Sequence, residues 1–191
     1  MPFCLKFHTH PDWTKEVLND FDTFLLDHAT AEKKASGMAM SMVSHYPDKP
    51  DLVAAMIDLA IEELTHFKQV TRVIYQRGLT LSADAKDPYV NALRGLMRSG
   101  KDDYFLDRLL IASIIEARGH ERFGLIAKAL EPGKLKQFYQ AITTSEGRHK
   151  DLFTKLAYQY FDKNSVTSRL EHLLDHEAAI VKELPIRSGL H

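Results

Sequence analysis

The chain has 191 residues, of which 45% are hydrophobic and 27% charged, which is typical of a soluble globular protein with a buried core. The 25 basic and 26 acidic side chains nearly cancel, so a nucleic-acid partner would have to bind a local patch. One cysteine, Cys4, excludes an intramolecular disulfide framework and metal sites built from several thiolates. Because no apolar stretch approaches the length of a membrane span and the first residues lack a secretory apolar region, we expect a cytoplasmic protein.

Two long helices are predicted in the first half of the chain. Apolar and small residues recur every three or four positions over 21–42, which indicates an amphipathic helix that ends at the proline-containing segment 45–50. Pro50 opens a second helix, and Gly78 closes it. A long connection then covers 79–101 and includes a short helical stretch near 88–98. We expect this connection to form a wall or lid of a substrate pocket, because long loops in compact domains are usually functional.

The second half of the chain repeats the helical pattern. A third helix is predicted over 102–130, and Pro132 and Gly133 mark the turn that follows it. A fourth helix extends to Tyr160, and a shorter fifth helix covers 166–184. Since no segment shows the alternation of a β-strand, the predicted class is all-α. We expect a single domain over 1–191, a four-helix bundle with a long connection between helices two and three and an added C-terminal helix.

Polar residues interrupt the predicted buried faces of all four bundle helices. Burying an isolated ionised carboxylate is costly unless it finds a partner, so these residues need a common explanation, and bound cations supply one. The six residues are Glu32, Glu63, His66, Glu116, Glu146 and His149.

The positions of these residues along the helices favour a metal site. A single Glu-x-x-His pair is most often a solvated pair on a helix surface, although its spacing does put both side chains on one face. Glu32 and Glu63 each lie roughly 20 Å from the turn that joins their helices, at 1.5 Å per residue. Glu116 and Glu146 lie at about the same distance from the second turn. Within each antiparallel hairpin the carboxylates are therefore expected at one level.

The ligand types indicate which metal is bound. Imidazole with several carboxylates and no thiolate suits iron or manganese better than copper(I) or structural zinc. One ion is assigned to Glu32, His66 and a bridging Glu63. The second ion is assigned to Glu116, His149 and a bridging Glu146, and open positions on both ions would bind dioxygen. One Glu from each of two helices and Glu-x-x-His from the other two is the ferritin-like di-iron pattern.

The segments around these residues also resemble a known family. They are DHATAEKKA, EELTHFKQV, IIEARGHERF and SEGRHKDLF, and the similarity extends from about Asp27 to about Tyr160. Together they resemble the tRNA hydroxylase family, which hydroxylates 2-methylthio-isopentenyl-adenosine next to the anticodon. The resemblance implies a nonhaem di-iron monooxygenase that uses two iron ions and dioxygen on modified tRNA. Because the sequence has no flavin or nicotinamide fingerprint, a ferredoxin and its reductase are the expected electron donors.

His120 departs from the family pattern, in which a small residue or cysteine is expected at this position. It lies one turn after Glu116, so it could support the ligands or act as an additional ligand. A histidine that is hydrogen-bonded within the core is the simpler interpretation. Arg118 and Arg122 are expected to pair with neighbouring carboxylates such as Glu121 and so to support the metal ligands.

The tRNA surface is predicted from basic residues alone. Arg94, Arg98 and Lys101 cluster in the long connection and could neutralise phosphates, with Lys33 and Lys34 as weaker candidates. Such residues are more often part of a solvated helix face.

Three other functions remain open at this point. A ferritin-like iron oxidase or storage subunit would share the metal ligands but would form a cage of many chains. A manganese catalase or another small-molecule di-iron oxidase would differ in metal content and in turnover of peroxide. A helical interaction module with purely structural core acids would bind no iron.

Overall fold

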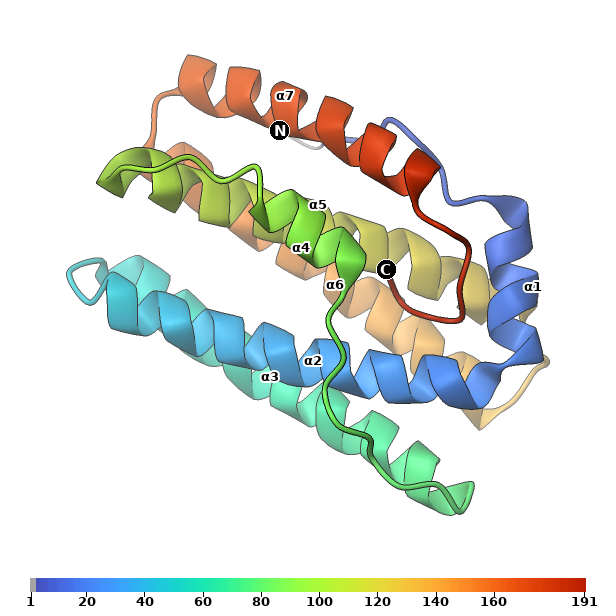
Figure 1. Ribbon diagram of the computed structural model, residues 1–191. Coiled ribbons are helices and arrows are strands. Elements are labelled where there is room, and N and C mark those ends of the chain that lie inside the picture. The colour runs from blue at the N-terminus through green and yellow to red at the C-terminus, as the bar shows by residue number, and fades with distance from the viewer. Residues whose placement is uncertain (1–2) are drawn as a thin grey trace. The chain divides into compact units, whose positions relative to one another are not determined.

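The computed structural model describes residues 3–191, which form seven helices and the segments between them (Figure 1). This confirms the predicted all-α class. None of these helices combines the length and apolar character that a membrane crossing requires. The helices are α1 (Pro11–Asn19), α2 (Phe21–His45), α3 (Pro50–Gln76), α4 (Pro88–Arg94), α5 (Lys101–Ala129), α6 (Lys134–Tyr160) and α7 (Lys163–Glu183).

The described chain divides into two compact units. One contains Lys15–Ala85 and Arg187–Leu190, and hence the helices α2 and α3. The other contains the chain up to Thr14, Lys86–Ile186 and His191, and hence α4 to α7. That the two units form one domain stays a prediction.

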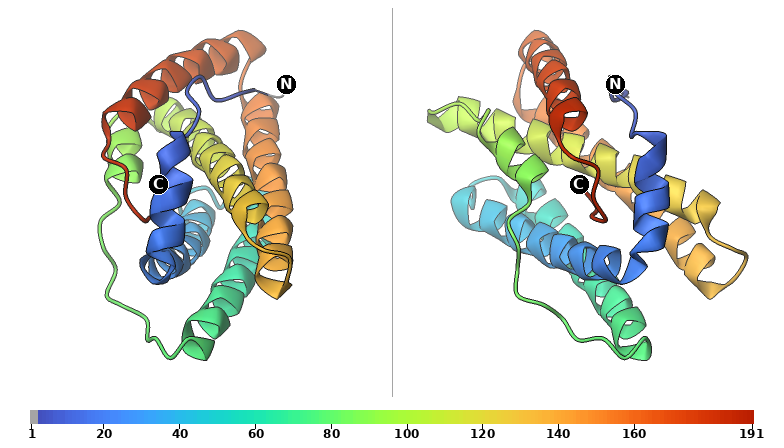
Figure 2. Two further views of the ribbon diagram at one scale, coloured as in Figure 1. Left: turned by 90° about the vertical axis from the view of Figure 1, so that its right-hand side faces the viewer. Right: turned by 45° about the vertical axis from the view of Figure 1, so that its right-hand side comes forward.

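The first unit is an antiparallel hairpin of α2 and α3 (Figures 1 and 2). The side chain of Asp20 accepts a hydrogen bond from the backbone N–H of Thr23 and so caps the start of α2. Pro50 occupies the first turn of α3, where its missing N–H leaves no helical bond unmade. The buried apolar residues of the two helices include Phe24, Leu25, Ala39, Met42, Leu52, Met56, Leu59, Val70 and Ile74.

The second unit is built around α5, which packs mainly against α6 and also contacts α4 and α7. Its N-cap residue, Gly100, has a φ of 104°, a conformation that L side chains rarely adopt. Asp162 caps α7 by accepting hydrogen bonds from two backbone N–H groups. Because helices surround it, α5 buries residues on most of its circumference.

Two helices differ from the sequence-based prediction. The helix predicted near 88–98 ends at Arg94, with Gly95 as its C-cap. Four residues after Arg94, the backbone N–H of Arg98 donates to the buried carboxylate of Asp107 at 2.8 Å instead of continuing the helix. The short helix α1 was not predicted from the sequence. Its buried residues are Trp13 and Val17, and the guanidinium of Arg122 lies 5.0 Å from the centroid of the Trp13 ring.

Candidate metal centre

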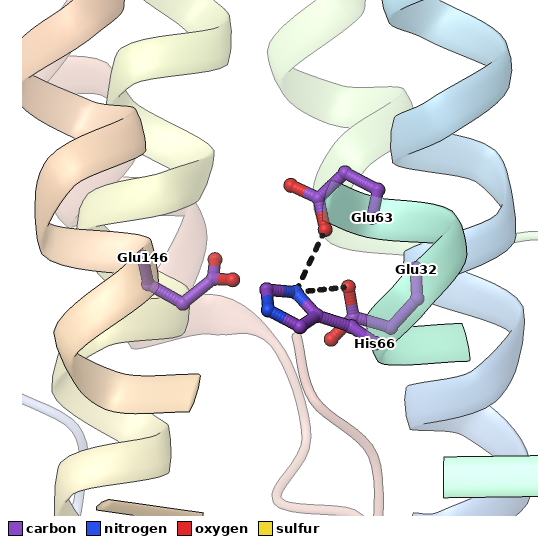
Figure 3. A group of neighbouring side chains, drawn as sticks. All are labelled: Glu32, Glu63, His66 and Glu146. Carbon is purple, nitrogen blue, oxygen red and sulfur yellow. Dashed lines mark hydrogen bonds and ion pairs between the residues drawn. The ribbon is translucent and has the colours of Figure 1, made fainter. Parts of the chain in front are cut away.

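The first unit contains a buried cluster of two carboxylates and one imidazole. Glu32 comes from α2, whereas Glu63 and His66 come from adjacent turns of α3. The Nδ1 atom of His66 lies 3.3 Å from Oε2 of Glu63 and 3.6 Å from Oε2 of Glu32. Figure 3 shows both carboxylates directed at this imidazole. One ligand atom from each of the three residues lies within 4.8 Å of the others, close enough to hold a metal ion.

A second histidine, which the sequence analysis did not identify, holds Glu32 in place. His28 lies one turn earlier on α2, is fully buried, and its Nε2 is 2.6 Å from Oε1 of Glu32. The i, i+4 spacing of the two residues could have revealed this contact.

Glu32 and His66 shift each other's pKa. Burial raises the pKa of Glu32, but hydrogen bonds with His28 and His66 outweigh burial and hold that pKa well below its usual range. Burial lowers the pKa of His66, whereas hydrogen bonds to Glu32 and Glu63 raise it to about 9. A proton on His66 thus compensates the negative charge that a bound cation would otherwise neutralise.

The second unit contains a cluster of the same composition. Glu116 comes from α5, and Glu146 and His149 come from α6. The Nδ1 atom of His149 lies 3.8 Å from Oε2 of Glu116 and 3.8 Å from Oε1 of Glu146. All three residues are buried, and one ligand atom from each lies within 4.8 Å of the others.

A glycine makes room for the carboxylate of Glu146, the residue from α6 that is also labelled in Figure 3. A Cβ atom at Gly119 on α5 would lie 3.1 Å from Oε2 of Glu146, which is tighter than most real contacts of a Cβ atom. In the interior of a helix, glycine lowers the stability by about 1 kcal/mol relative to alanine. Its presence in the middle of α5 therefore indicates that the Glu146 carboxylate needs the space.

The donor atoms of both clusters fit iron or manganese. Each cluster offers two carboxylates and one imidazole and no thiolate, a set that suits these metals better than copper(I). The six residues named from the sequence therefore lie in two triads, one in each unit. Each triad combines a Glu-x-x-His motif with a Glu from the neighbouring helix of its hairpin.

The other residues singled out in the sequence have defined contacts. Arg118 forms an ion pair with Glu121, as expected, and another with Glu177 of α7, which the sequence analysis did not anticipate. His120 is hydrogen-bonded through Nδ1 to the backbone carbonyl of Thr143 at 2.7 Å. This bond agrees with the simpler interpretation, a histidine that is hydrogen-bonded within the protein.

The basic residues of the connection differ in their surroundings. Arg98 is bound to Asp103 at 2.7 Å and to Asp107 at 2.8 Å, so its guanidinium is engaged within the protein. Arg94 and Lys101 are exposed.

Comparison with known proteins gives concordant matches. A family model described as tRNA-(MS2IO6A)-hydroxylase (MiaE) matches residues 2–191. A curated tRNA 2-(methylsulfanyl)-N(6)-isopentenyladenosine(37) hydroxylase of Pseudomonas putida is 34% identical over 185 residues, covering 94% of this chain and 90% of that protein. The Salmonella typhimurium protein of the same name is 28% identical over 168 residues, covering 86% of this chain and 61% of its own length.

A solved structure resembles the whole chain. It is described as Protein 43 with aldehyde deformylating oxygenase activity, from Synechococcus. The TM-score is 0.94 at 33% identity, and the match covers 100% of this chain and 96% of that one.

Proposed function

The chain belongs to the tRNA-(MS2IO6A)-hydroxylase family, and we propose that it hydroxylates the isopentenyl group of 2-methylthio-isopentenyl-adenosine at position 37 of tRNA, using dioxygen. The observation that carries this proposal is the family match over residues 2–191 together with buried Glu and His triads on all four long helices of the two hairpins. The relative in Pseudomonas putida, named for the same reaction, is matched over 90% of its length.

The proposed cofactor is a pair of iron ions. Glu32 and His66 would bind one ion with Glu63 as a bridge, and Glu116 and His149 would bind the other with Glu146 as a bridge. The four carboxylates can neutralise two divalent cations, which supports this stoichiometry. When bound, iron supplies the activation of dioxygen, a chemistry that amino-acid side chains cannot perform.

The side chains of the chain prepare this site in three ways. His28 fixes the orientation of Glu32 through a 2.6 Å contact, so the carboxylate need not reorganise when an ion enters. His66 would have to lose its proton to act as a ligand, so the binding of an ion would be coupled to proton release. The burial of all six ligands keeps bulk water away, which prevents side reactions during hydroxylation.

The reaction needs partners besides the tRNA. Inserting one oxygen atom into a C–H bond while reducing the other to water consumes two electrons from outside the protein. We propose a ferredoxin and its reductase as donors and a cytoplasmic location, where tRNA is available. Arg94 and Lys101 are the proposed phosphate contacts in the connection, whereas the ion pairs of Arg98 leave its guanidinium less available for RNA.

One assay tests the proposal directly. The protein is loaded anaerobically with ferrous iron and given isopentenylated tRNA, a ferredoxin reductant and dioxygen, after which the nucleosides are digested and weighed. The expected product is the prenylated adenosine with one additional oxygen atom. A parallel reaction with an aldehyde tests the activity named for the Synechococcus protein. Turnover of the aldehyde and not the tRNA, or bound iron without a nucleoside product, would contradict the proposal.

A further inference from the structure

Two lysines directly after the proposed ligand Glu32 are bound by the connection between α3 and α4. Nζ of Lys33 lies 2.7 Å from a carboxylate oxygen of Asp84. Nζ of Lys34 donates to the backbone carbonyl of Ala85 at 2.5 Å. Figure 1 shows this connection crossing α2 as an extended, non-helical segment. Residues 84–85 therefore form a strap across the outer side of α2.

The lysines and Glu32 share one level of the helix but point in different directions. At 3.6 residues per turn, Lys34 is rotated by about 200° from Glu32, so one side chain faces the core and the other faces away from it. Glu32 is 4% exposed, whereas both lysines are exposed. The two lysines thus lie at the same level of the α2 axis as the proposed metal ligand Glu32, on the solvent-exposed side of the helix.

The groups that hold the lysines are easily replaced by phosphate. The strap offers one carboxylate oxygen and one carbonyl oxygen on consecutive residues, and the oxygens of RNA phosphates are acceptors of the same kind. Lys33 and Asp84 retain 44% and 41% of their side-chain exposure, and exposed ion pairs of this type contribute little stability. The phosphates of an incoming RNA can therefore replace the strap as partners of the two lysines at a small cost in free energy.

We propose that Lys33 and Lys34 bind phosphates of the tRNA and that the strap at residues 84–85 covers them until the RNA displaces it. This inference rests on the proposed function, because it names the part of the surface that receives the tRNA backbone. Since Glu32 precedes the pair by one residue, the phosphates bound here belong to nucleotides that flank the modified adenosine.

The first test is the salt dependence of RNA binding. A fluorescent anticodon stem–loop is titrated with the full-length protein at several KCl concentrations, and binding is followed by anisotropy. For Lys33→Gln with Lys34→Gln, the slope of log K against log salt should fall by about 1.4 to 1.8, at about 0.7 to 0.9 per lost phosphate contact. The control is Lys68→Gln with Arg72→Gln, which removes the same charge from exposed positions of α3. An unchanged slope, or an equal fall in the control, overturns the proposal.

The second test uses the competing carboxylate. Asp84→Asn removes the oxygen that occupies Lys33, so RNA should bind about threefold more tightly, as expected for the loss of an exposed ion pair. This gain should disappear when Asp84→Asn is combined with Lys33→Gln. Tighter binding that persists in the double variant would show that the gain comes from net charge alone and would overturn the strap as a competitor.

A third measurement separates this inference from the proposed function. The free prenylated nucleoside has no phosphate, so its hydroxylation should be the same in the lysine double variant and in the wild-type protein. Loss of nucleoside turnover would mean that the lysines act on the fold or on the metal site, which contradicts a phosphate role. Lys33→Arg with Lys34→Arg should restore RNA binding. Because anisotropy detects binding without turnover, a failure of hydroxylation in the wild-type protein would refute only the proposed function.

Discussion

Arg118 of α5 and Glu177 of α7 are both fully buried and form an ion pair with an Nη2–Oε1 distance of 2.6 Å. The hydroxyl of Tyr89 on α4 donates to the same carboxylate oxygen at 3.0 Å. Arg118 also donates to the backbone carbonyl of Phe7 at 2.8 Å. This ion pair thus connects α4, α5 and α7 with the N-terminal segment of the second unit, and α5 is the helix that carries Glu116.

Breaking this pair should be far more harmful than removing it. Arg118→Met leaves the carboxylate of Glu177 buried without its counter-charge, so we expect the free energy of unfolding to fall by about 3 to 5 kcal/mol. Replacing both residues by Met should recover most of that loss, because no isolated charge remains. Urea denaturation followed by circular dichroism measures both values. A double variant as unstable as Arg118→Met would mean that the shape of the pair, and not its charge, stabilises the unit.

Removing one carboxylate from either triad should reduce bound iron. Glu63→Ala and Glu146→Ala each delete a proposed bridging ligand, so iron should fall well below two ions per chain while the helical circular dichroism spectrum is retained. Iron analysis after anaerobic loading provides the measurement. Asp151→Ala, whose side chain on α6 is 69% exposed, is the control that should bind the wild-type amount. Full occupancy in both ligand variants would disprove the assignment.

Gly119→Ala should separate stability from metal binding. The new methyl group would press on Oε2 of Glu146 from 3.1 Å and displace it by a few tenths of an ångström, so iron bound at the second triad should decrease. Helix propensity favours alanine by about 1 kcal/mol, and thermal stability should therefore not fall in parallel. The matched variant is Gly124→Ala on the same helix, where the nearest atom, in Thr143, would lie at an ordinary 3.5 Å. If both variants bind iron equally, Gly119 does not make room for the ligand.

Asp107 should make stability depend on acid pH. Burial raises the pKa of this carboxyl, but the bonds from Arg169 and Arg98 prevail and lower it below its usual range. The resulting stability is present above the unfolded-state pKa of about 3.9 and is lost as the pH falls through the lower folded-state value. At neutral pH, Asp107→Asn should lower the free energy of unfolding by about 2 to 3 kcal/mol. Denaturation at a series of pH values should show this difference shrinking below about pH 4.

The basic residues of the connection should divide into two roles. Arg94→Ala with Lys101→Ala should weaken tRNA binding and flatten its salt dependence, because both side chains are exposed. Arg98→Ala should mainly reduce stability, since it deletes the bonds to Asp107. Titrations over a range of salt together with thermal melts distinguish the two effects. If Arg98→Ala loses more RNA affinity than the variant with Arg94→Ala and Lys101→Ala, Arg98 is the phosphate contact and the assignment is wrong.

The parts of the fold that follow local rules could be predicted from the sequence. The long helices were recognisable because apolar residues recur with the helical period and because Pro50 and the Pro132–Gly133 turn interrupt it. The same periodicity placed Glu63 and Glu146 on buried faces, where the structure has them at 1% and 5% exposure. Charged residues on a buried face are informative because burial without a partner is so costly.

The remaining features depend on contacts between distant parts of the chain. Lys33 and Asp84 are 51 residues apart, and Arg118 and Glu177 are 59 apart, so no local pattern links them. The backbone N–H of Arg98, four residues after α4, is likewise bound by Asp107 on a different helix. The helix α1 is short, and its Trp13 is buried against Arg122 rather than on an amphipathic face of a longer pattern. Partner choice among charged side chains requires the three-dimensional structure.

The separation of the two triads into successive hairpins has a consequence for biosynthesis. The first hairpin covers residues 21–76 and closes through a turn of four residues, so its contacts are mostly local and form early. A ribosome releases this hairpin before it has finished α5, since the parts of a chain emerge in the order of their synthesis. Glu32, Glu63 and His66 can thus meet while Glu116, Glu146 and His149 are still untranslated. The nascent chain would carry half of the proposed ligands before the other half exists.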